Sequence, residues 1–153
     1  MDPRISAIEA LPAQLRAAVD GLTDAQLDTC YRDGGWTVRQ VVHHIADSHL
    51  NAFVRAKLIL TEDHPTLKPY DQDRWALLSD AKSFPIQSSL AIIDGVQARL
   101  AEIFKHASPE DRKRTAHHPE DGELSLEDLL TKYATHGEGH LKQITDLRGR
   151  MGW

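Results

Sequence analysis

Hydrophobic residues recur at the three- and four-residue spacing of an α-helix in four long segments of this 153-residue chain. The first segment begins after Asp2-Pro3, an N-cap followed by proline, and ends near Gly21. The other three are predicted at 38–61, 86–106 and 126–148. Four amphipathic helices of this length predict an all-α four-helix bundle, formed by one domain that spans residues 1–153.

The connection between the second and third helices, from Thr61 to Pro85, lacks this periodicity apart from a short helical pattern at 71–78. An irregular segment of this length is uncommon in a compact domain unless it is functional or disordered. Tyr70 and Trp75 provide apolar surface that can pack against the bundle. We therefore expect a long crossover loop that forms a lid or a pocket wall.

Residues 112–123 are polar, contain His117 and His118, and close with the turn signal Asp121-Gly122. We expect this stretch to be a loop and both histidines to be loop residues. No segment of the chain shows the alternation of a β-strand.

The fourth helix carries two histidines, His136 and His140, four residues apart. This step returns to nearly the same helical face with a rise of about 6 Å, so both imidazoles can meet one metal ion. Both fall on the apolar, core-facing stripe, where ordinary hydrogen-bonded core histidines are the alternative. Gly137 and Gly139 favour a special role, because glycine costs about 1 kcal/mol in a helix interior and indicates a need for space. The zincin motif H-E-x-x-H is excluded, since Glu138 points away.

Polar side chains follow one margin of the second helix at His44, Ser48, Asn51 and Arg55. A solvated helix face explains the last three without any function, and the alternative is that they line a pocket beside His44. His44 differs, because it can reach the pair on the fourth helix and complete a three-nitrogen set if the two helices are neighbours. Asp47, one turn from His44, either orients a ligand or is a plain surface carboxylate.

Composition excludes several classes of partner and site. The net charge is −5 with basic residues scattered, so no nucleic-acid-binding or membrane-binding surface is indicated. No apolar run approaches the roughly 20 residues of a membrane span, and no signal peptide begins the sequence, so we expect a cytoplasmic protein. Cys30 is the single cysteine, so any metal must take nitrogen or oxygen ligands.

Two motifs resemble the YfiT branch of the DinB superfamily: GGWTVRQVVHHIADS at 34–48 and YATHGEGH at 133–140. The similarity continues through 58–62, 65–70, 80–82, 118–120 and the terminal 152–153, so it covers most of the chain. The resemblance implies a four-helix bundle, commonly a homodimer, that is a metal-dependent hydrolase with a divalent ion on three histidines.

The resemblance also implies which histidines bind the ion. His44 is the first ligand, in the family context H-[ILV]-A-D, and His136 and His140 are the other two, whereas His43 does not bind. The sequence departs from the family pattern at Gly139, where relatives often carry histidine, and it has no counterpart of their segment before the first helix.

Three histidines leave at least one coordination position open, as in catalytic zinc sites. Water in that position supports hydrolysis of an amide or ester in a small-molecule substrate. Two alternatives stay open: transfer of a small thiol such as bacillithiol, mycothiol or glutathione, bound as thiolate, and a non-catalytic, metal-stabilised stress or binding module. We expect one divalent ion per chain, zinc first and nickel second.

Overall fold

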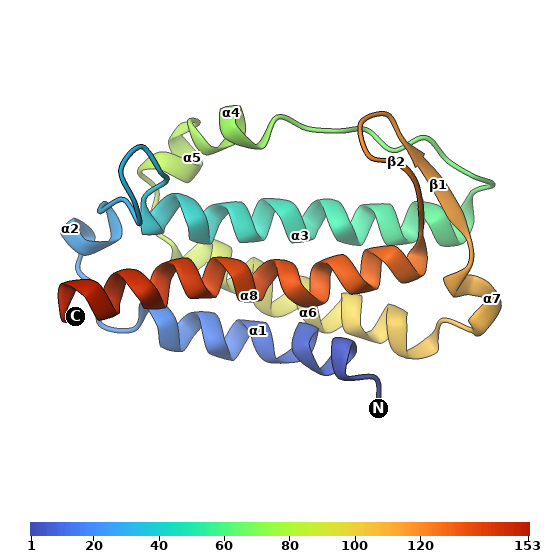
Figure 1. The fold of residues 1–153 in the computed structure, drawn as a ribbon, viewed down its shortest axis with the longest axis horizontal. Coiled ribbons are helices and arrows are strands. Elements are labelled where there is room, and N and C mark those ends of the chain that lie inside the picture. The colour runs from blue at the N-terminus through green and yellow to red at the C-terminus, as the bar shows by residue number, and fades with distance from the viewer.

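The computed structural model describes all 153 residues and contains four long helices (Figure 1). Their bounds are α1 Pro3–Val19, α3 Val38–Thr61, α6 Gln87–His106 and α8 Leu126–Met151. Each bound lies within three residues of the predicted one, which confirms the four-helix bundle. The remaining elements are α2 Asp24–Leu27, α4 Gln72–Ala76, α5 Ser79–Lys82, α7 Pro109–Arg112, β1 Thr115–His118 and β2 Gly122–Ser125.

Capping residues explain why the two helices that matter most for the site begin where they do. Thr37 accepts a hydrogen bond from the Gln40 backbone and Gln40 returns one to the Thr37 backbone, so α3 begins at Val38. Ser125 and Asp128 form the same reciprocal pair at the start of α8. Both helix starts are therefore specified locally by sequence.

The four long helices form a ring in which α1 and α3 each pack between α6 and α8. Figure 1 shows α1 and α8 running in one direction and α3 and α6 in the other. The core consists of two clusters along the bundle, one around Leu15 and Ile45 and the other around Ile8, Ile59 and Phe104. No helix combines the length and the apolar character needed to cross a membrane.

The crossover segment follows from this topology. Because α3 and α6 are parallel, the chain must return along the length of α3 before α6 can begin (Figure 1). The short helices α4 and α5 lie along this return path and pack against α3, with Ala76 and Ala81 buried. Gln40 on α3 donates a hydrogen bond to the Ala76 carbonyl at 2.8 Å and fastens the segment to the bundle.

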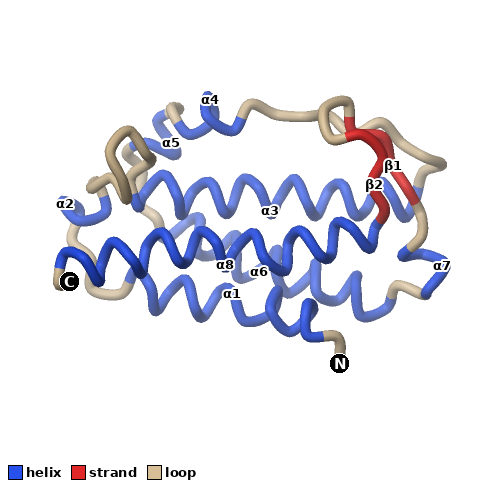
Figure 2. The backbone as a smooth tube through the Cα atoms, in the orientation of Figure 1, coloured by secondary structure: helices blue, strands red, loops and turns tan.

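The prediction that 112–123 is a loop without strands is wrong. Strands β1 and β2 form an antiparallel hairpin that places His118 opposite Gly122 (Figure 2). Gly122 has φ +82°, which the turn requires and which only glycine adopts readily. The crossover segment pairs with β1 as well, because the Leu67 backbone donates to the His117 carbonyl at 2.8 Å. Strands of four residues carry too little alternation to be predicted from sequence.

Candidate metal centre and its cavity

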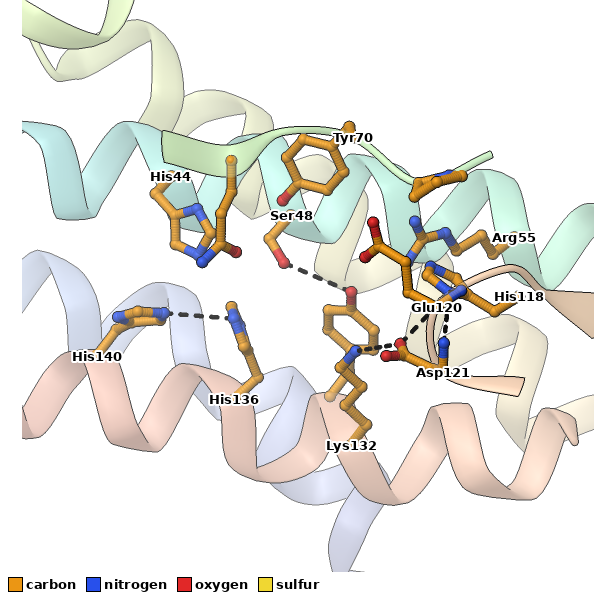
Figure 3. Close-up of a pocket in the computed structure, with 13 residues that line it drawn as sticks. His44, Ser48, Arg55, Tyr70, His118, Glu120, Asp121, Lys132, His136 and His140 are labelled. Atoms are coloured by element: carbon orange, nitrogen blue, oxygen red, sulfur yellow. Dashed lines mark hydrogen bonds and ion pairs between the residues drawn. The ribbon is translucent and has the colours of Figure 1, made fainter. Parts of the chain in front are cut away.

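Three histidines from two neighbouring antiparallel helices converge on one point (Figure 3). His44 projects from α3, and His136 and His140 project from α8. One ring nitrogen of each lies within 4.8 Å of the others. The second and fourth long helices, α3 and α8, are neighbours, and this packing brings the three residues together.

His43 faces another part of the molecule, as expected for the adjacent position on a helix. Its Nδ1 lies 2.6 Å from Ser89 Oγ and its Nε2 lies 2.9 Å from the Phe84 carbonyl oxygen. Both ring nitrogens are thereby engaged, one with α6 through Ser89 and the other with the end of the crossover segment through Phe84.

His136 and His140 lie on the predicted stripe of α8 with the buried residues Tyr133 and Ile144, and both are half-buried and line a cavity. The core-facing residue between them is Gly137, which is buried. A Cβ at Gly137 would lie 2.6 and 2.7 Å from the two methyl carbons of Leu11, so this glycine permits the close approach of α1 and α8. Gly139 has open space around it, so the predicted need for space does not extend to that position.

A buried hydrogen-bond chain sets the tautomer of His136. Gln97 donates from Nε2 to the Ile8 carbonyl at 2.9 Å, so its Oε1 accepts from His49 Nδ1 at 2.5 Å. His49 Nε2 then carries a lone pair, which accepts from His136 Nδ1 at 3.2 Å. The proton of His136 is therefore on Nδ1, and its Nε2 presents a lone pair.

His140 Nδ1 lies 2.9 Å from the side-chain amide of Gln143. The Nε2 atoms of His136 and His140 lie 3.3 Å apart, and His136 presents its Nε2 lone pair at this point. Neutral imidazole nitrogens are common metal ligands, so a cation here can bind both rings. The residues present thus fit a metal ion.

Burial keeps the imidazoles of this centre neutral. Together with the neighbouring histidines, it lowers the pKa of His44 to about 3 and that of His136 to about 2. Burial also lowers the pKa of His140 and brings that of His49 to about 4. Neutral imidazole is the form that binds metals, so protons compete little for these nitrogens near neutral pH.

These shifts predict how the metal-free protein responds to acid. Below about pH 6.5 the histidines take up protons in the unfolded chain but stay neutral in the folded one, so stability falls as pH decreases. Each contributes up to about 1.4 kcal/mol per pH unit. Asp47, whose pKa burial and Asp80 raise to about 6, acts in the opposite direction but is one group against four. Urea unfolding of chelated protein between pH 7.5 and 5 measures the slope, and a flat profile would contradict buried neutral histidines.

A cavity of about 340 Å³ extends from the three histidines toward the β1–β2 turn. Three of the predicted pocket residues line it, namely Ser48, Arg55 and Tyr70. Figure 3 shows the histidines at one end, Ser48 and Tyr70 in the middle, and Arg55 with His118 at the other end. The margin of α3 is therefore a cavity wall along most of its length rather than a solvated face.

Three predicted pocket residues do not line this cavity. Trp75 packs against Tyr70, with ring centroids 4.6 Å apart, and so backs the wall without forming it. Asn51 donates its side-chain amide to the Asp47 carbonyl one turn earlier in α3. Asp47 forms no hydrogen bond to a histidine, so its predicted role in orienting a ligand has no support in the geometry.

Two residues of the site were not predicted from the sequence: His49, whose ring supports His136, and His118, which is buried at the far end of the cavity. His49 lies five residues after His44, a spacing that matches no ligand pattern. His118 belongs to the hairpin that was predicted as a loop. Lys132 and Tyr133, which also line the cavity, lie one helical turn before His136 and could have been found from that spacing.

Comparisons with known proteins identify the family of this chain. The family model described as the DinB superfamily matches residues 7–144. A relative from Oceanobacillus iheyensis is 48% identical over 97% of this chain and 86% of its own length. YfiT of Bacillus subtilis is 45% identical over 99% of this chain and 86% of its own length. Both are named "putative metal-dependent hydrolase".

The fold is shared as well. A solved structure of Bacillus subtilis YfiT superposes with a TM-score of 0.96 at 44% identity, covering 99% of this chain and 87% of that one. It is described as a probable metal-dependent hydrolase with an unusual four-helix bundle topology. With the family match over most of the chain and this agreement in fold, the protein belongs to the YfiT branch of the DinB superfamily.

Proposed function

We propose that the protein is a metal-dependent hydrolase of a small-molecule substrate, with one divalent ion held by His44, His136 and His140. The observation that carries the proposal is the convergence of one ring nitrogen from each of the three histidines, within 4.8 Å of one another, at the end of a cavity. Three protein ligands and access from a cavity are the features of a catalytic rather than a structural site. The names of the relatives support the same class of activity.

A divalent ion at this centre would supply Lewis-acid polarisation of a carbonyl and a water activated near neutral pH. The residues of the chain then orient the substrate and provide protons. Burial raises the pKa of Tyr70, so its hydroxyl stays protonated and can donate to a leaving group. Ser48 Oγ and Tyr133 Oη, 3.5 Å apart, lie in the same middle region of the cavity. The carboxylates that line the cavity, Glu120 and Asp121, lie at the opposite end from the histidines.

The support of His136 by His49 leads to a prediction about metal affinity. His49→Phe keeps an aromatic ring in the buried space but removes the acceptor that fixes the His136 tautomer. We expect metal affinity to fall by about 10–100-fold, the usual effect of losing such a partner. Competition with a chromophoric chelator measures it. Unchanged affinity in a folded His49→Phe protein would show that the chain from Gln97 does not position the ligand.

The activity itself is tested on protein loaded with zinc or with nickel, the first and second expected metals. A panel of esters and amides is assayed with and without each small thiol, and the metal-free protein is the control. Hydrolysis that needs metal but no thiol is expected. Turnover only with a thiol would replace the proposal of hydrolysis by one of thiol transfer. The thiol would then have to be the added one, since the single cysteine, Cys30, is exposed and does not line the cavity.

The homodimer stays a prediction, and sedimentation of the same sample measures it.

A further inference from the structure

Arg55 is a buried cation without an anionic partner. It exposes only 8% of its surface, donates one hydrogen bond, from Nη2 to the Lys68 carbonyl at 3.2 Å, and takes part in no ion pair. Arg39, which is buried to a similar extent, is paired with Asp28 at 2.7 Å and Asp24 at 3.1 Å. A buried charge is costly unless it is paired. The missing partner of Arg55 therefore calls for an explanation.

The unused hydrogen-bond donors of Arg55 open onto the cavity. No buried side-chain nitrogen or oxygen of the molecule lacks a partner, so the remaining N–H groups of Arg55 have access to solvent, and Arg55 lines the cavity. An arginine fork with free donors binds a carboxylate or another oxyanion through two parallel hydrogen bonds. The geometry thus presents an anion-binding group at the end opposite the three histidines (Figure 3).

His118 adds a second donor at the same end. Its Nδ1 accepts from the backbone N–H groups of Glu120 and Asp121 at 3.2 and 3.0 Å, so the proton of the neutral ring is on Nε2. His118 exposes only 4% of its surface and lines the cavity, and its Nε2 has no partner in the protein. Two side chains, each more than nine-tenths buried, therefore offer free donors to one cavity end.

The charges around this end favour a monoanion. Lys132 also lines it, but its ammonium lies 4.0 Å from Asp121, whose carboxylate is also 3.7 Å from His118 Nδ1. Glu120 lines the same end and is exposed. The carboxylates of Glu120 and Asp121 repel a dianionic ligand such as a phosphate monoester. A ligand with a single carboxylate carries one negative charge, which Arg55 balances while His118 donates a hydrogen bond.

We propose that Arg55 and His118 bind a carboxylate of the substrate while the reacting group lies at the three histidines, so that the substrate class is a carboxylate-bearing ester or amide. The placement of the reacting group at the three histidines rests on the proposed function, whereas the anion site at Arg55 and His118 does not. His44 and Arg55 are eleven residues apart on α3, about 16 Å between their Cα atoms along the helix axis. Because both side chains extend into the cavity, the reacting group and the carboxylate are separated by a chain of several bonds.

Bifunctional probes test this on the metal-loaded protein. Alkyl hydroxamates bind the metal through the hydroxamate, and tails of four to eight methylenes end in a carboxylate, in the neutral carboxamide or in a phosphonate. At the best length, calorimetry should show the carboxylate binding about 10–100-fold more tightly than the carboxamide, the range that hydrogen bonds to a charged group provide. The phosphonate should not exceed the carboxylate.

Substitution of Arg55 assigns the effect. Arg55→Gln should remove the preference for carboxylate and leave carboxamide affinity and metal content unchanged, and Arg55→Lys should keep only part of the preference. Arg99, an exposed residue on α6 that packs over Phe53, provides the control. Arg99→Gln changes the net charge by the same amount and should bind all probes as the wild type does. Equal affinity for carboxylate and carboxamide tails in the wild type at every length would overturn the anion site. Failure of all hydroxamates to bind would instead count against the metal centre.

Discussion

Replacing any one of His44, His136 and His140 by alanine is expected to remove most of the bound metal and to reduce hydrolysis to the background rate. Each substitution deletes one of only three nitrogens that meet within 4.8 Å. The loss of metal affinity should exceed the about 10–100-fold expected for an outer partner such as His49. Elemental analysis of the purified proteins measures metal content, and circular dichroism establishes that each variant is folded.

His43→Ala is the matched control for this experiment, because it removes a neighbouring buried imidazole that points elsewhere. It should retain metal in full, although it leaves Ser89 and the Phe84 carbonyl without their partner and should lower stability by about 1–3 kcal/mol. The folded His43→Ala protein could instead lose as much metal as the His44 variant. That result would contradict the assignment of His44, rather than His43, as the histidine of α3 that faces α8.

The helices could be predicted because their signals are local. Capping residues such as Thr37 and Ser125 and a continuous 3.6-residue period place the helix starts without reference to the rest of the chain. The convergence of His44 with the α8 pair required one further assumption, that the second and fourth helices are neighbours. The structure meets this condition, because α8 packs against α3 and runs antiparallel to it (Figure 1).

The cavity could not be predicted in the same way, because its walls depend on contacts between distant segments. The far end is formed by a hairpin of two four-residue strands, one of which pairs with the crossover segment through Leu67 and His117. Nothing in the local sequence of His118 shows that it is buried facing Arg55's end of the cavity. Likewise, Tyr70 forms the wall and Trp75 only supports it, a distinction set by how the segment packs rather than by composition.

Removing the ion with a chelator is expected to abolish activity while the helices persist. A domain of about 150 residues buries roughly 68–70% of its unfolded surface, so the bundle does not require a metal to fold. Neither of the two hydrophobic clusters includes a histidine of the centre. Far-ultraviolet circular dichroism at 25 °C should therefore be unchanged on chelation, and hydrolysis by the same sample should vanish and return when zinc is added.

The thermal midpoint separates the two roles of the ion. A ligand that binds only the folded state stabilises it by RT ln(1 + [L]/Kd), so the Tm should rise with free zinc and fall on chelation without loss of cooperativity. Without the ion, the centre retains neutral imidazoles rather than an unpaired charge, so its removal should destabilise the fold without collapsing it. Loss of the helical signal on chelation at 25 °C would instead assign the ion a structural role. The three histidines would then bind a metal that the fold needs, and not one that serves catalysis.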